Sequence, residues 1–85
     1  MKALVEFIVK RLVDKPDEVI VSEIDGDTTI VIELKAAKDD IGKVIGKEGK
    51  TIKAIRLLLS AASAKIKKRS VLELIEDERD AAGKT

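Results

Sequence analysis

"IGKVIGKEGKTI", residues 41 to 52, separates a short apolar segment from the longest amphipathic segment of this 85-residue chain. Gly46 and Gly49 bracket Lys47 and Glu48 within it. A side chain at either glycine would block the close approach of another backbone, and Gly46 is placed to end a short helix in a left-handed conformation. The stretch therefore predicts a tight turn between two helices.

A nucleotide-triphosphate loop is the alternative that the sequence Gly49-Lys50-Thr51 raises. Such a loop needs a glycine six positions before its lysine so that backbone amides can wrap the phosphates, but Val44 stands there. The loop must also follow a strand of a parallel sheet directly, whereas a helical turn is predicted before these glycines. The pattern therefore disfavours an NTPase.

Two amphipathic helices are predicted around this turn and before it. Residues 3 to 13 place Leu4, Ile8 and Leu12 on one helical stripe, and Phe7 among them is assigned to the core. After the glycines, a second core stripe has the three-and-four spacing of a helix; its residues are Ile52, Ile55, Leu59, Ala62 and Ile66.

Three strands complete the pattern. Residues 18 to 36 give two β-branched strands around Asp25-Gly26, where positive φ angles would allow a tight hairpin turn. The second strand alternates, with Ile30, Ile32 and Leu34 on one face. Asp39 or Asp40 is expected to cap the short helix before the glycines, and residues 70 to 76 form the last strand. The order is αββααβ, which predicts an α+β fold.

A single domain over residues 1 to 76 is expected, since 85 residues leave no room for a second core. Residues 77 to 85 have little to bury and predict an acidic, flexible tail. No apolar run approaches membrane-spanning length. The first residues meet charges too early for a signal peptide, which favours a cytoplasmic protein.

Charge and composition narrow the function classes. Residues 14 to 40 hold nine acids and three bases, net −6, whereas residues 43 to 69 hold nine bases and one acid, net +8. The basic block is therefore suited to binding anions. The absence of Cys and His removes thiolate chemistry and the ordinary zinc, iron and copper ligand sets. We therefore expect no catalytic residues, no metal and no cofactor. Asn and Gln are also absent, which fits a thermophile.

The residues from Ile45 to Ile52 resemble the I-G-x-x-G-x-x-I core of the KH domain, a module that binds single-stranded RNA and DNA. The resemblance extends to the preceding residues 40 to 44 and to the element order, which is that of the type II KH fold. It covers the chain from about Leu4 to Ile75. A KH domain of this length is similar to the KhpA group of small bacterial RNA-binding proteins, and implies a three-stranded sheet with helices packed on one face.

The resemblance also implies roles for the residues around the GxxG loop, residues 46 to 49. The loop would clamp the backbone of about four nucleotides while bases lie on an aliphatic groove. The candidate RNA-binding residues are Ile41, Gly42, Lys43, Val44, Ile45, Gly46, Lys47, Glu48, Gly49, Lys50, Lys53 and Arg56. Among them, Ile41, Val44 and Ile45, together with Ile52, form either the groove floor or the core beneath it. Residues 65 to 69, KIKKR, either form a second basic wall or complement a helix C-terminus.

The leading hypothesis is thus a cytoplasmic RNA chaperone or post-transcriptional regulator, binding single-stranded RNA or also DNA, with no membrane or small-molecule substrate. The resemblance further implies a homodimer, or a heterodimer with a Jag/KhpB-like partner, and a link to cell shape. The alternative is a dimerisation scaffold with a KH fold and little nucleic-acid binding. Leu57, Leu58, Ala61 and the first helix carry more apolar surface than one core stripe needs, which is either an interface or the second side of a buried helix.

Overall fold

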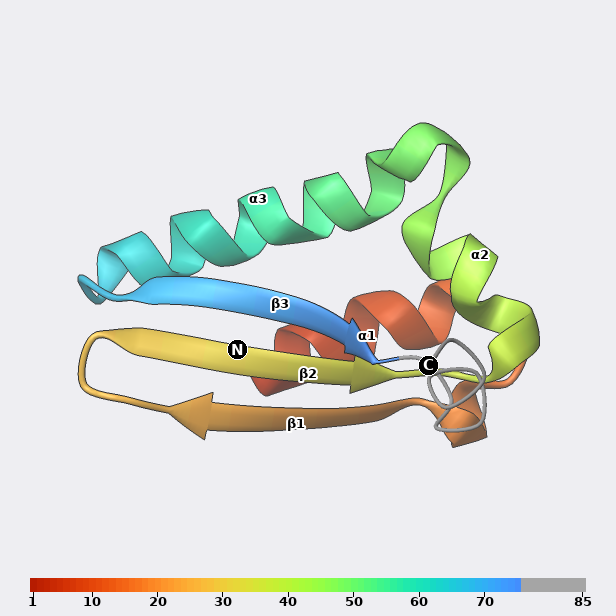
Figure 1. Cartoon of the computed structure of the whole chain (residues 1–85), viewed down its shortest axis with the longest axis horizontal. Coiled ribbons are helices and arrows are strands. Elements are labelled where there is room, and N and C mark those ends of the chain that lie inside the picture. Colours follow the sequence, from red (N-terminus) through yellow and green to blue (C-terminus); the bar gives the residue numbers. More distant parts are fainter. Residues whose placement is uncertain (76–85) are drawn as a thin grey trace, which may run out of the picture.

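The computed structural model describes residues 1 to 75 as a three-stranded sheet with its helices on one face (Figure 1). The elements are α1 (Lys2–Leu12), β1 (Ile20–Asp25), β2 (Thr29–Lys35), α2 (Ile41–Ile45), α3 (Lys50–Lys65) and β3 (Arg69–Ile75). This order confirms the predicted αββααβ succession and the α+β class. The tail predicted for residues 77 to 85 lies outside the described residues.

The sheet has the strand order β1-β2-β3, with β2 in the centre. β1 pairs with β2 antiparallel, and β3 pairs with β2 parallel. A parallel neighbour needs a long crossover, and here α2 and α3 supply it: α3 runs beside β3 in Figure 1, so that β3 returns along the helix. The glycine-rich turn therefore lies at the opposite end of α3 from the turn into β3.

The predicted hairpin between β1 and β2 is confirmed, but its turn differs from the expected one. Positive φ angles within residues 1 to 75 do not occur at Asp25 or Gly26. The strands are joined instead by a longer connection, which the Gly26 N–H closes by donating to the Thr29 carbonyl at 2.9 Å. Three residues between the strands give the chain room to reverse without left-handed geometry.

The core lies between one face of the sheet and the three helices. Ile30, Ile32 and Leu34 of β2 are buried, which confirms the predicted inner face of that strand. The helices contribute Val5, Val9, Val44, Ile52, Ile55 and Leu59, and the neighbouring strands contribute Val21 and Leu72. Each helix is thus anchored to the same sheet face, and α2 is anchored by Val44.

The buried stripe of α1 is not the predicted one. Val5 and Val9 are fully buried, whereas Leu4 is 38% exposed. Phe7 was predicted in the core, and this is wrong: its side chain is 59% exposed, with the Arg11 guanidinium 4.5 Å from the ring centroid. The helix carries apolar residues on more than one side, so periodicity alone does not select the face, and packing against the sheet selects the smaller valines.

The core stripe of α3 is confirmed at Ile52, Ile55 and Leu59 and wrong beyond them. Ala62 and Ile66 are exposed, and Ser63 is buried instead. The Ser63 hydroxyl donates to the Ser60 carbonyl at 3.2 Å, which satisfies its hydrogen. The reason is that the helix ends at Lys65 and the chain turns away into β3.

Candidate nucleic-acid interface

The turn between α2 and α3 is built from unusual backbone angles. Gly46 follows α2 with φ 77° and ψ 173°, a region that essentially only glycine occupies. Its N–H donates to the Gly42 carbonyl at 2.9 Å, which closes α2. Glu48 (φ 57°) and Gly49 (φ 73°) are both left-handed, after which α3 begins. The predicted tight helix-to-helix turn is confirmed.

The two glycines of this turn face different surroundings. A Cβ atom on Gly46 would lie 2.6 Å from the Thr51 Cβ and 2.9 Å from the Thr51 backbone nitrogen. A Cβ atom on Gly49 would meet no closer atom than the Lys53 Cε, at 3.8 Å. The space in front of Gly46 is filled by the chain itself, whereas a Cβ atom at Gly49 would make only an ordinary van der Waals contact with the Lys53 side chain. Of the two glycines, Gly49 is therefore the one that leaves room for another molecule.

Three lysines lie within or close to this turn, at residues 47, 50 and 53. Lys47, Lys50 and Lys53 are exposed, and they form no ion pair with any residue from 1 to 75. No side chain caps the first turn of α3, whose N-cap is Gly49. A helix N-terminus carries partial positive charge, so the amides and the lysines favour an anion together. Glu48 is the one acid within the turn.

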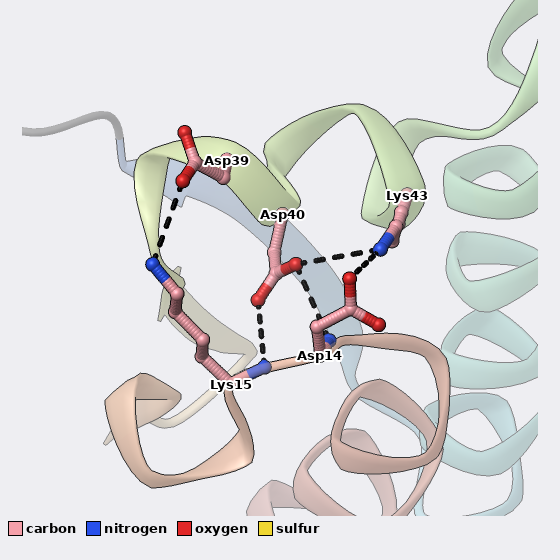
Figure 2. Close-up of polar contacts among 5 residues, drawn as sticks. All are labelled: Asp14, Lys15, Asp39, Asp40 and Lys43. Atoms are coloured by element: carbon pink, nitrogen blue, oxygen red, sulfur yellow. Dashed lines mark hydrogen bonds and ion pairs between the residues drawn. The ribbon is translucent and has the colours of Figure 1, made fainter.

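Lys43, by contrast, is engaged by acids of its own chain. Its ammonium group pairs with the Asp14 carboxylate and lies 3.9 Å from the Asp40 Oδ1 (Figure 2). The hydrogen bond to Asp14 raises the pKa of Lys43 above its ordinary value. The structure thus places this candidate in an ion-pair cluster at the end of α1, and an incoming phosphate would have to compete with two carboxylates for it.

Burial divides the apolar candidates into two groups. Val44 and Ile52 belong to the core, and Ile41 is half-buried. Ile45 is 36% exposed, and no atom lies within 4 Å of a Cβ built on Gly42. Gly42 and Ile45 are three residues apart on α2 and share a side of it. They are the candidates that remain at the surface beside the turn.

Beyond the turn, α3 runs beside the edge strand β3 (Figure 1). The Arg56 Nη2 donates to the Leu72 carbonyl at 3.4 Å, so this candidate reaches across to the edge strand. Further along lies a shallow hollow of about 360 Å³, lined by Ser60, Ser63, Lys68, Arg69, Ser70 and Val71. Within the KIKKR segment, Lys68 donates to the Asp25 Oδ1 at 2.6 Å and the Gly26 carbonyl at 3.0 Å. Lys68 therefore links the start of β3 to the hairpin turn between β1 and β2.

Two residues make contacts near the turn that the sequence pattern did not predict. Thr51 packs over Gly46, and Asp40 is buried with its carboxylate bonded to the segment after α1. Asp40 does precede α2 as expected, but its side chain makes no capping bond to that helix. Spacing along the chain carries no signal for either contact. Within residues 1 to 75, no group of His, Cys, Asp and Glu side chains could hold a metal, and no helix could cross a membrane.

Comparisons with known proteins agree with this architecture. The family model of the KhpA/KhpB KH domain matches residues 2 to 74. RNA-binding protein KhpA of Clostridium acetobutylicum is 56% identical over 75 residues, covering 88% of this chain and 100% of that protein. RNA-binding protein KhpA of Aquifex aeolicus is 49% identical over 76 residues, covering 89% of this chain and 96% of that protein. No solved structure matches the chain.

Proposed function

This chain belongs to the KhpA/KhpB family of KH domains, and from that premise we propose that it binds single-stranded RNA, with the RNA backbone at the GKEG loop, residues 46 to 49. The observation that carries the proposal is that no backbone atom from outside this turn lies within 4 Å of a Cβ built on Gly49, only the exposed Lys53 side chain, with Lys47 and Lys50 exposed on either side of Gly49 in the chain. A phosphate there would meet the uncapped start of α3 as well as the lysines. The family is one of RNA-binding proteins and not of enzymes, in accord with the expected lack of catalysis.

Bases would lie on the surface beside the loop rather than on an aromatic platform. Phe7 is the one aromatic residue of the chain, and it lies on α1. KH domains bind without stacked aromatic side chains, since their loop holds the nucleic-acid backbone. Gly42 and Ile45 offer an exposed apolar strip for bases, and Arg56 reaches from α3 to the edge strand β3. Val44 and Ile52 would support that strip from within the core.

Fluorescence anisotropy with a short, mixed-sequence single-stranded RNA tests the proposal. Wild-type affinity should fall with salt by about 0.7 log unit per log unit of salt for each phosphate neutralised. Lys47→Asp combined with Glu48→Asp should abolish binding. Lys35→Asp makes the same change of charge on the last residue of β2, outside the loop, and should bind nearly as wild type. Equal affinities of the two variants would contradict a role for the loop. A DNA strand of the same sequence shows whether the 2′-hydroxyl is read.

In the cell, we propose that this binding serves a cytoplasmic RNA chaperone or post-transcriptional regulator, with cell shape among the processes affected. A chaperone should speed the annealing or unfolding of structured RNA without being consumed. Strand-exchange assays with labelled RNA measure that rate, and the loop double variant is the control. Unchanged rates with wild-type protein, despite binding, would leave regulation by occupancy as the mode of action.

Pairing with another KH module is a second proposal, for which exposed apolar residues provide the support. Leu57 and Leu58 of α3 are 70% and 52% exposed, and Ala61 is exposed beside them. A second copy, or a Jag/KhpB-like partner, would cover this surface and add a second RNA site. Sedimentation analysis should show a dimer that Leu57→Glu with Leu58→Glu dissociates. Ile66→Glu, at 55% exposure off this surface, is the control. If wild type pairs but binds no RNA, a scaffold function replaces the first proposal.

A further inference from the structure

Asp40 is a buried carboxylate with partners far along the chain. Its side chain is 1% exposed. The carboxylate accepts the N–H of Asp14 at 3.2 Å and the N–H of Lys15 at 3.0 Å, and Lys43 lies on its other side (Figure 2). Burying a charge is costly unless it is hydrogen-bonded and paired. These contacts satisfy that requirement, and they join the segment after α1 to the start of α2.

The Asp40 contact, meaning these two amide bonds, is not the ordinary role of a residue at the start of a helix. Asp40 stands at the N-cap of α2, yet its side chain gives no capping bond to that helix. Its oxygens are used instead on amides 25 and 26 residues away. The contact therefore fixes where α2 lies relative to α1, which a local cap would not do.

α2 needs such an anchor because it is short. It has five residues, and an isolated helix of that length is not stable in water. Its position is set by the buried Val44 on one side and by Asp40 at its start. Gly46 follows α2 directly and is packed against Thr51 of α3, so little slack separates α2 from the GKEG loop. A shift of α2 would move Lys47 of the loop relative to the start of α3.

We propose that Asp40 is a positioning residue for nucleic-acid binding: its bonds to the Asp14 and Lys15 amides hold α2 and the GKEG loop in the conformation that accepts a phosphate at Gly49. This inference rests on the proposed RNA binding. Asp40 itself does not touch the RNA, because its side chain is only 1% exposed.

Loss of the acidic charge and loss of the Asp40 contact should change RNA affinity in opposite directions. Removing an acid from a protein that binds RNA strengthens binding if charge alone matters, since the protein becomes more positive. Asp39 provides the matched control: it is the adjacent acid, its side chain is 82% exposed, and it contacts the Lys15 ammonium rather than backbone amides. Asp39→Asn and Asp40→Asn thus change the net charge equally, but the second variant alone leaves one of the Asp14 and Lys15 amides without its carboxylate acceptor.

RNA affinity of the two variants, measured by anisotropy at a temperature where both are folded, decides between these roles. Asp40→Asn should bind roughly 2- to 30-fold more weakly than wild type, and its salt slope should fall. Asp39→Asn should bind as wild type or slightly more tightly. Ile30→Ala, in the core at the far end of β2, controls for lost stability and should retain affinity while it is folded. Equal affinity of the Asp39 and Asp40 variants would overturn the inference but leave the proposed function intact, whereas no binding by wild type would overturn the proposed function.

Hydrogen exchange on the wild-type protein gives a second readout that needs no variant. If the Asp40 contact and RNA binding favour the same position of α2, RNA must strengthen the contact in return, because coupling between two sites is reciprocal. The amides of Asp14 and Lys15 should therefore exchange more slowly with RNA present, by more than the core amides of β2 do. Unchanged exchange at these amides would overturn the inference. This test remains valid if Asp40→Asn fails to fold, because it uses the wild-type protein.

Discussion

Thr51 packs its side chain over Gly46, in the space that a Cβ atom at residue 46 would need. This contact joins the end of α2 to the first turn of α3 and sets the two glycines of the loop apart. Gly46 is needed for the packing of the protein on itself, whereas a Cβ atom at Gly49 would contact only the Lys53 side chain, at 3.8 Å. The two positions should therefore respond differently to the same substitution.

Gly46→Ala should destabilise the protein more than other single substitutions in the loop. Its backbone angles essentially require glycine, at about 1–3 kcal/mol for another residue, and the added methyl would press on Thr51. We expect a loss of more than about 2 kcal/mol in the free energy of unfolding. Urea denaturation followed by circular dichroism measures it. A loss below that of Gly49→Ala would show that the loop relaxes around the methyl group.

Gly49→Ala should affect binding more than folding. A left-handed alanine costs about 1–2 kcal/mol, but its methyl group meets no atom closer than 3.8 Å. The protein should remain folded, and the methyl would occupy the space proposed for the RNA backbone. Titration with single-stranded RNA should show weaker binding by the folded variant. Undiminished affinity would place the RNA backbone elsewhere on the surface.

Lys67→Gly should stabilise the protein. Lys67 has φ 59° where α3 ends, and the Lys68 and Lys67 amides donate to the carbonyls of Ser63 and Ala64 at 2.9 and 3.0 Å. This hydrogen-bond pattern normally places glycine at the left-handed position. The substitution relieves backbone strain in the folded state, and the greater flexibility of glycine in the unfolded chain offsets part of this gain. The free energy of unfolding should therefore rise by up to about 1 kcal/mol.

The control for that change is Lys65→Gly, in the last turn of α3, which removes the same charge from a right-handed helical position. It should lower the free energy of unfolding, by less than about 1 kcal/mol so near the helix end. Thermal melts of both variants test the pair. Destabilisation by both changes would mean that the Lys67 side chain contributes more than its backbone strain costs.

The pKa of Lys43 should lie above its ordinary value of 10.5, because Asp14 hydrogen-bonds to the ammonium group. Since the folded-state pKa is raised, the stabilisation is complete below pH 10.5 and is lost as the pH rises through the folded-state pKa. An NMR titration of the Lys43 side chain should show its deprotonation above pH 10.5. Asp14→Asn should lower the pKa of Lys43 toward the ordinary value. No change in that variant would contradict the ion pair in solution.

Local patterns sufficed for much of this protein. The order of helices and strands, the inner face of β2, the first part of the α3 core stripe and the turn at Gly46 and Gly49 were all predicted from the sequence. Each rests on neighbours a few residues apart, whose spacing and conformational range act before any distant contact forms. The family resemblance follows from the same short motif.

Tertiary structure decided the rest, because it depends on residues far apart in the sequence. Packing against the sheet selected Val5 and Val9 in place of Phe7, since α1 is apolar on several sides. The ion pair with Asp14 distinguishes Lys43 from Lys47, which is unpaired within residues 1 to 75, although the two lysines look alike in sequence. The burial of Asp40 likewise required the end of α1 and the start of α2 to meet, and no spacing along the chain encodes that meeting.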